Sequence, residues 1–278
     1  MSGIDCHQHF WWTARRAHSF PPPVGDRLER DFTPDDLRPE LAAAGVDATV
    51  LVQSLNDLDE TIEYLDLQCE VDYIAGVVGW VPLAEPAACE RALASLSGRG
   101  KLVGIRHLIA YEPDPAWLLQ PAVLDSLGLL AQAGLVFEAI PVTAHQLDSV
   151  FALAGRLPQL KIVLNHMGNP PVSEQGWEPW ASQIARATAL PNMSVKLSAG
   201  LALVMTWRWQ TEAVRRYSDH VLERFGPQRV MAASNWPVVL LGGSFVQVWR
   251  GITDLIGGLG AQEQKAVLGG NARRIYDL

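Results

Sequence analysis

Short runs of β-rich apolar residues recur along the chain, and stretches with helical spacing lie between them. There are eight such runs, at residues 4–10, 48–54, 73–81, 102–109, 135–142, 161–168, 193–199 and 230–237. A parallel strand that a helix covers carries near-continuous apolar sequence, and eight strand–helix units suit a chain of 278 residues. The alternation predicts one α/β domain over 1–278, folded as a (β/α)8 TIM barrel.

Turn and cap residues support this division of the chain. Thr33 and Pro34 suit the N-cap and first turn of a helix, and Gly45, Gly134 and Gly226 stand where helices should end. A doubly wound open sheet is the alternative, but the first run lacks the glycine-rich turn of dinucleotide-binding sheets. The connection over 11–32 is too long for an ordinary loop, so we expect an active-site flap, with an incidental surface loop as the alternative.

Charge and composition exclude several classes of binding partner. The formal net charge is −8, and the sequence lacks the clustered Lys and Arg that phosphate binding needs, so we expect no nucleic-acid partner. Cys6, Cys69 and Cys89 are widely spaced without a Cys-x-x-Cys pair, which favours reduced thiols. We find no apolar run of about 18 residues and no signal peptide. We therefore expect a cytoplasmic protein with a small-molecule substrate and no membrane partner.

Polar and aromatic residues gather where the predicted strands end. They are His7, His9, Gln53, Trp80, Arg106, His107, Glu138, His166, Lys196, Ser198, Asn235 and Trp236. Barrel enzymes carry their catalytic groups at the C-terminal ends of the strands. Each residue alone could be a satisfied core residue, but buried ionisable groups are costly unless they are paired or coordinated. Their shared position at one rim therefore predicts a functional site.

Three of these side chains constrain the chemistry most. His7 and His9 alternate with their neighbours on a strand, so both imidazoles face the same side. Neutral imidazole is a common zinc ligand and carries protons near neutral pH, while a structural histidine pair is the alternative. Lys196 interrupts an apolar strand, so it must face the barrel mouth or pair with a carboxylate. Asp5 is expected one layer below His7, as its supporting partner.

Motifs from the first strand to the last resemble the amidohydrolase superfamily, and within it the sugar lactonases of the L-fuconolactonase and L-rhamnonolactonase branch. They are residues 4–11, 104–107, 164–168, 195–198 and 225–238. The resemblance implies an amidohydrolase-like barrel that opens a sugar-acid lactone of the L-fucono-, L-rhamnono- or L-galactono-lactone type, or another small lactone, by adding water. It places His7, His9, His166 and the eighth-strand position at the centre of the site.

One position departs from the family pattern. The family usually has aspartate in the Ser-Asp-Trp-Pro motif of the last strand, where it serves as general base and can ligate metal. Here that position is Asn235, and an amide cannot take up a proton at neutral pH. General-base assistance typically supplies about 10²- to 10⁴-fold in rate, so another group must do this work or the activity must differ.

Two catalytic schemes stay open. In the first, zinc on His7, His9 and His166 lowers the pKa of bound water to about 7, and Asn235 is a weak ligand or hydrogen-bond partner. In the second, no metal is held and His107 or His166 activates water, while Arg106 and Lys196 polarise the lactone carbonyl. We expect one divalent metal, zinc before others, and leave metal-independent activity open.

Aromatic residues predict how the substrate is held. Flat rings cover the CH faces of a sugar, and indole N–H groups bond hydroxyls, although loop packing is the alternative for any single tryptophan. The expected substrate contacts are Trp11, Gln53, Trp80, Arg106 and Trp236. For Arg106, a salt bridge to Glu138 or Asp5 is the simpler alternative. Two other functions remain: a non-oxidative decarboxylase of the same superfamily, whose members commonly begin with Glu-x-His, and a ligand-binding homologue impaired at Asn235.

Overall fold

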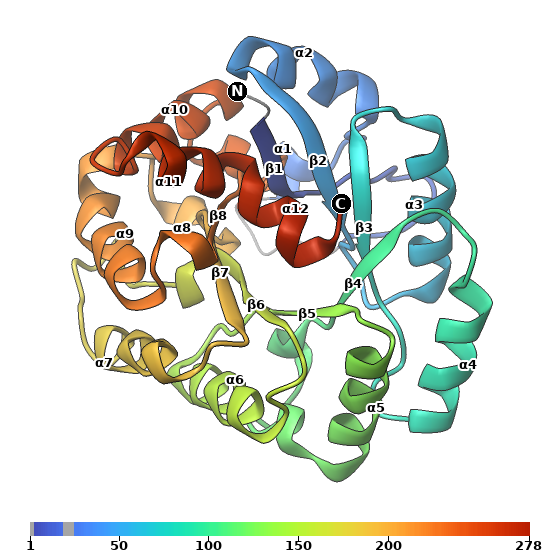
Figure 1. The fold of residues 1–278 in the computed structure, drawn as a ribbon. Helices are drawn as coiled ribbons and strands as arrows, with labels where there is room; N and C mark the ends of the chain where they lie inside the picture. Colours follow the sequence, from blue (N-terminus) through green and yellow to red (C-terminus); the bar gives the residue numbers. More distant parts are fainter. Residues whose placement is uncertain (1–2, 19–24) are drawn as a thin grey trace.

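Eight parallel strands form one sheet in chain order, and helices surround them (Figure 1). The computed structural model describes residues 3–18 and 25–278. The strands are β1 (Gly3–Gln8), β2 (Val46–Val52), β3 (Ile74–Gly79), β4 (Leu102–Arg106), β5 (Val136–Ala139), β6 (Ile162–Leu164), β7 (Met193–Leu197) and β8 (Val230–Ala232). The sheet closes beyond β8, where the Asn235 amide donates to the His7 carbonyl at 2.9 Å. The predicted (β/α)8 barrel is confirmed.

The strands are shorter than the apolar runs that predicted them. β6 stops at Leu164, and Asn165–Gly168 forms a short helical turn (η3) in its place. β8 likewise ends at Ala232, ahead of the predicted 230–237 run. The reason is that the polar residues at the strand ends leave the sheet ladder, so that their side chains face the barrel mouth.

Helices cover the outside of the barrel, as the periodicity predicts. Those that follow the strands are α2 (Pro34–Ala44), α3 (Leu58–Glu70), α4 (Pro86–Leu96), α5 (Pro121–Gln132), α6 (Ala144–Arg156), α7 (Trp180–Ala185), α8 (Leu201–Thr206), α9 (Thr211–Phe225) and α10 (Phe245–Leu255). α2 begins at the predicted cap, where Thr33 and Asp36 form a capping box, and Pro34 occupies the first turn. It ends at Gly45, whose φ of 68° lies in the left-handed region that glycine adopts freely.

The C-terminal segment closes the barrel at the end opposite the site. It comprises α11 (Ala261–Lys265), the turn η7 (Ala266–Gly270) and α12 (Asn271–Tyr276), and α12 lies in front of the strands in Figure 1. Ala272, Ile275 and Tyr276 of α12 join a buried cluster with strand residues such as Ile4 and Val136. A larger apolar cluster fills the space between the strands and the outer helices.

The long first connection contains a short helix, α1 (Gly25–Leu28). Trp11 pairs with Phe32 across its base, and the Trp11 indole donates to the Arg30 carbonyl at 2.9 Å. Residues 19–24, the middle of the predicted flap at 11–32, lie outside the described residues. Its role as a flap stays a prediction.

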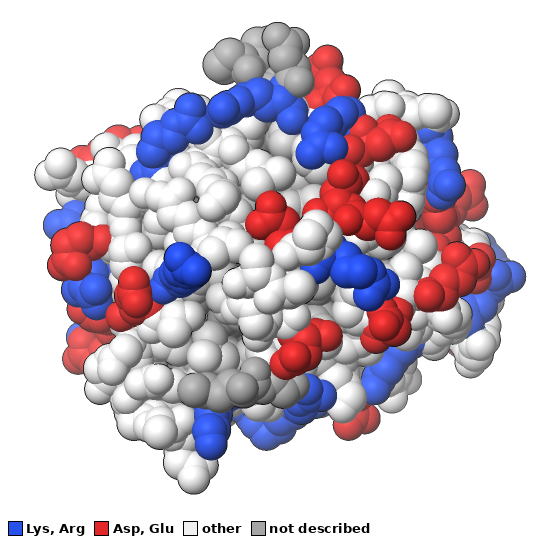
Figure 2. Space-filling model, turned by 90° about the horizontal axis from the view of Figure 1, so that it is seen from above, with Lys and Arg blue, Asp and Glu red and all other residues white. Residues whose placement is uncertain are grey.

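The surface carries charges of both signs. On the face drawn in Figure 2, a row of Lys and Arg side chains follows the upper edge, and beside it Asp and Glu side chains lie directly against Lys and Arg side chains. Among the described residues, none of the helices combines the length and the apolar character needed to span a lipid bilayer.

Candidate functional site

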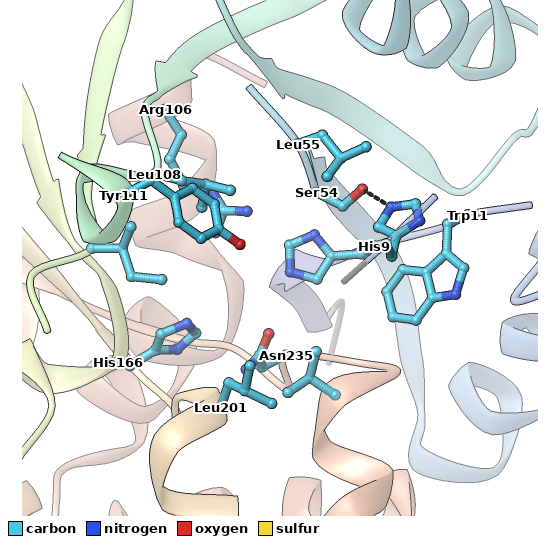
Figure 3. Close-up of a pocket in the computed structure, with 13 residues that line it drawn as sticks. His9, Trp11, Ser54, Leu55, Arg106, Leu108, Tyr111, His166, Leu201 and Asn235 are labelled. Atoms are coloured by element: carbon cyan, nitrogen blue, oxygen red, sulfur yellow. Dashed lines mark hydrogen bonds between the residues drawn. The ribbon is translucent and has the colours of Figure 1, made fainter. Parts of the chain in front are cut away.

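A pocket of about 170 Å³ opens at the C-terminal ends of the strands. Five predicted site residues line it, namely His9, Trp11, Arg106, His166 and Asn235. Figure 3 shows the His9, His166 and Asn235 side chains pointing toward one cavity, although they come from the first, sixth and eighth strand ends. The barrel thus brings together residues that are far apart in the sequence.

Three imidazoles form a compact group at this pocket. The Nε2 atoms of His7 and His9 lie 3.1 Å apart, and the ring centroids of His7 and His166 are 4.7 Å apart. Burial lowers the pKa of His9 to about 3 and holds the pKa values of His7 and His166 well below 6.5, with further lowering from Lys196 and Arg106. All three rings are therefore neutral near neutral pH.

A buried ion pair supports His7 from below. The ammonium of Lys196 lies 2.6 and 2.7 Å from the two carboxylate oxygens of Glu138, and both side chains are fully buried. Tyr276 of α12 donates to the same carboxylate at 2.6 Å. Lys196 Nζ also lies 3.2 Å from His7 Nδ1. Because an ammonium only donates, Nδ1 of His7 faces a hydrogen-bond donor.

The guanidinium of Arg106 lies beside the histidines. Its Nη1 atom is 3.2 Å from His7 Nε2, and its Nη2 donates to the carbonyl of Gln53. Burial lowers the pKa of Arg106 to about 10, so the group stays charged. Within the described residues its side chain forms no salt bridge to Glu138 or Asp5, the alternative considered from the sequence. It therefore presents a positive charge to the pocket.

Asp5 lies below His7, as expected from the strand alternation. Its carboxylate accepts from the backbone amides of His7 at 3.1 Å and Ser234 at 2.8 Å, and from the Ser234 hydroxyl. Burial nevertheless raises its pKa to about 6. Asp5 therefore ties the first strand to the last at the point where the barrel closes.

Two pocket residues hold left-handed backbone conformations. His166 has a φ of 52° and Asn235 a φ of 63°. Such conformations cost about 1–3 kcal/mol for non-glycine residues and cluster at functional sites, with asparagine tolerating them best. His166 Nδ1 lies 2.8 Å from the Ser198 hydroxyl, and the Asn235 amide donates to the Ala199 carbonyl at 2.9 Å. Both side chains are thus fixed by the end of β7.

Other predicted site residues lie beside the pocket without lining it. His107 contacts Glu112 at 2.7 Å and stacks on Trp117, and Trp80 donates to its Nδ1 at 3.0 Å. Gln53 is buried and donates to the Arg106 carbonyl, while Lys196 is buried beneath the histidines. Trp236 is also buried and packs against Phe10 and Phe32. Their predicted roles in catalysis or substrate binding stay predictions.

The three histidines only partly resemble the ligand set of the predicted zinc ion. The 3.1 Å between the His7 and His9 Nε2 atoms suits two ligands of one zinc ion. A ligating histidine donates its other N–H to an acceptor, however, and His7 has the Lys196 ammonium there. Within the described residues, no group of three or more His, Cys, Asp or Glu side chains is arranged to hold a metal ion. As placed, His7, His9 and His166 therefore do not fit a three-ligand centre.

The pocket includes residues that the sequence did not single out. They are His18, Ser54, Leu55, Leu108, Tyr111, Ile140, Leu201 and Val238. Ser54 connects the pocket to the buried Glu60, whose carboxylate accepts from the Ser54 amide at 2.9 Å. Ser54, Leu108 and Ile140 belong to the predicted apolar runs, but the strands end before them, so they lie in the loops at the barrel mouth. The pattern that predicted the strands does not show which of their residues face the pocket.

The comparisons with known proteins agree with this fold. The sequence model of the Amidohydrolase family matches residues 4–278, and the chain belongs to this family. An L-fucono-1,5-lactonase from Burkholderia ambifaria is 35% identical over 98% of this chain and 94% of that protein. Two crystal structures of an amidohydrolase from Burkholderia multivorans, one with HEPES and one with zinc bound, superpose with TM-scores of 0.89 and 0.88. They are 32% and 33% identical, and each match covers both chains fully.

Proposed function

We propose that this protein hydrolyses the lactone ring of a sugar acid, of the L-fucono-, L-rhamnono- or L-galactono-lactone type. The observation that carries the proposal is the convergence of His166, Arg106 and Asn235 on one pocket at the barrel mouth. The 35% identity to an L-fucono-1,5-lactonase along nearly the whole chain supports the substrate class.

Hydrolysis begins with the addition of water to the lactone carbonyl carbon. His166 is suited to accept the proton of that water, because its Nδ1 is engaged by Ser198 and no hydrogen bond from a described residue reaches its Nε2. A neutral imidazole at the pocket wall has the lone pair that a general base needs. The resemblance places an aspartate general base at the position of Asn235. In this chain His166 takes that role.

The carbonyl oxygen becomes negatively charged as water adds. Arg106 supplies a fixed positive charge for that oxyanion, with its guanidinium held by the Gln53 carbonyl. The ring C–O bond then breaks, and the departing ring oxygen takes the proton from His166. The product is the open-chain hydroxy acid, and His166 returns to its neutral form.

Zinc and a cytoplasmic location stay predictions. A bound zinc ion would act as a Lewis acid on the carbonyl. Because the donor set does not fit three ligands, every step proposed here uses only the chain's own groups. Metal analysis of protein purified without added metal, together with its turnover, tests this choice: activity that follows zinc content in proportion contradicts the metal-free scheme.

Proton release from a panel of L-fucono-, L-rhamnono- and L-galactono-lactones tests the proposed function. We expect turnover of at least one of them, above the rate of spontaneous ring opening. Carbon dioxide release from aromatic or enoic acids, measured on the same preparation, tests the decarboxylase alternative. Absence of lactone turnover combined with thermal stabilisation by a sugar acid would instead indicate a binding protein.

A further inference from the structure

A second, larger cavity adjoins the pocket. Its volume is about 550 Å³, and it lies between the loops that follow β4, β5, β6 and β7. The two cavities share Leu108, Tyr111, Ile140, His166 and Leu201. His166, the proposed base, thus stands at the boundary between them. A molecule bound at His166 can therefore continue into the second cavity without leaving the protein surface.

The lining of this second cavity, here called the rim groove, is mostly apolar. Beyond the shared residues it comprises Ala110, Val142, Asn169, Gly200 and Ala202. Among the described residues, no Lys, Arg, Asp or Glu lines it, and the amide of Asn169 already donates to the Pro141 carbonyl at 2.6 Å. The groove therefore offers few free partners for the hydroxyls of a sugar.

Exposed apolar side chains mark the same groove. Among the described residues, the large apolar side chains that are exposed are Tyr111, at 70%, and Val142, at 48%, and both line it. Exposed apolar area that is gathered at one place commonly marks a binding surface. Figure 3 shows Leu108, Tyr111 and Leu201 around the part of the cavity that His166 borders.

From this continuity we propose that the rim groove binds an apolar substituent carried on the lactone ring, such as an alkyl chain. The proposal rests on the proposed lactone hydrolysis and deepens it. The lactone group lies among Arg106, His166 and Asn235, and the substituent extends past Leu201 toward Val142. The preferred substrate is then a lactone with one polar and one apolar side.

Kinetics on a homologous series tests the groove. The series is δ-hexalactone, δ-octalactone and δ-decalactone, which carry methyl, propyl and pentyl groups on the same ring, with L-fucono-1,5-lactone measured in parallel. Burial of one methylene is worth about fourfold, so kcat/KM should rise at least about tenfold from methyl to propyl and again to pentyl. A flat or falling series overturns the proposal.

Charge-introducing variants test which residues form the groove. Val142→Asp and Ala202→Asp each place a carboxylate in it, and both positions are exposed, so folding tolerates the change. We expect the ratio of kcat/KM for the pentyl and methyl lactones to fall at least about tenfold in both variants. Ala43→Asp, at an exposed position of α2, is the matched control and should keep the wild-type ratio.

The outcomes separate this proposal from the function on which it rests. If L-fucono-1,5-lactone and the alkyl lactones all fail to react, the lactonase function falls, and the groove proposal with it. If the sugar lactone reacts but chain length has no effect, only the groove proposal falls. A dimer that Val142→Asp dissociates, with no effect of chain length, would instead assign the groove to a second copy of this chain.

Discussion

The site has two parts that differ in almost every physical respect. Beneath the pocket, Glu138, Lys196 and Tyr276 are buried, and each contacts at least one of the others through a charged or hydroxyl group. Around the rim groove, Tyr111 and Val142 are exposed apolar side chains. The lower part lies on strands and on α12, whereas the rim lies on the short helix η1 (Ile109–Tyr111), on α8 and on loops.

The two parts differ in how much structural change they tolerate. A buried charge must be paired, so the lower part tolerates little change in geometry. Exposed apolar side chains contribute little to folding, so the rim can vary with the substrate. We infer that the lower part fixes the reacting groups and that the rim selects the ligand, and the predictions below test this division.

The largest effect is expected for His166→Asn. Asparagine tolerates the left-handed φ of 52° at this position, so the variant should fold, but it cannot take up a proton. Turnover of the best sugar lactone should fall about 10²- to 10⁴-fold with little change in KM. The exposed His145 of α6, changed to Asn, is the control and should keep full activity. Wild-type turnover in the His166 variant would remove this histidine from the mechanism.

Loss of the buried ion pair should be the largest effect on stability. Lys196→Met leaves Glu138 without its cation, and breaking a fully buried pair costs about 3–5 kcal/mol. Urea unfolding followed by circular dichroism measures the free energy of unfolding. The double variant with Glu138→Gln should lose less than Lys196→Met alone, because it leaves no unpaired charge. Lys101→Met, at an exposed position, should change stability by less than about 0.5 kcal/mol.

The lower part of the site was largely predictable from the sequence. A lysine within an apolar strand needs a carboxylate or the barrel mouth, and Lys196 indeed pairs with Glu138. Strand alternation predicted that His7 and His9 face one side, and their Nε2 atoms lie 3.1 Å apart. A buried charge needs a partner, and the two-residue period of a strand decides which face a side chain takes. These two requirements explain why the barrel and its polar centre could be inferred from the sequence.

The rim could not be predicted in the same way. Tyr111 lies in a connection without periodicity, whereas Val142 ends the predicted run 135–142 but lies beyond β5, which stops at Ala139. Their proximity depends on how loops from different strands meet. The contact from Tyr276 to Glu138 was also missed, because α12 reaches the barrel only through the closing C-terminal segment. The sequence likewise gave no indication that Trp236 packs against Phe10 rather than lining the pocket.

A smaller effect on stability is expected for a change at Asn235, whose side chain contacts the loop after β7. Asn235→Asp replaces the amide that donates to the Ala199 carbonyl, and an ionised carboxylate would repel that oxygen. We expect a loss of about 1–3 kcal/mol in the free energy of unfolding, measured in urea, and reduced turnover. The matched change Asn192→Asp tests a partly buried amide far from the pocket, which donates to the carbonyls of 154, 157 and 160. A large rise in turnover for Asn235→Asp would show that the site lacks a base.

The buried histidines should make stability depend on pH. The pKa of His9 is lowered from 6.5 to about 3, so the folded chain binds fewer protons than the unfolded chain between these values. His9 therefore contributes stability above pH 6.5 that is lost on acidification, at about 1.4 kcal/mol per pH unit. Asp5, whose pKa is raised to about 6, acts in the opposite sense. Comparing wild type with His9→Gln isolates the histidine, and parallel stability curves for the two would contradict its buried, neutral state.

The smallest effect is expected at the rim, and it completes the comparison. Tyr111→Ser removes a large ring that is 70% exposed, so little apolar burial is lost. Its free energy of unfolding should stay within about 0.5 kcal/mol of the wild-type value, as for most surface substitutions. Tyr64→Phe is the counterpart, since it removes a buried hydroxyl that donates to the Phe10 carbonyl and should cost about 1 kcal/mol. If Tyr111→Ser were the more damaging change, the rim would be part of the folding core, and the separation of reacting groups from ligand selection would fail.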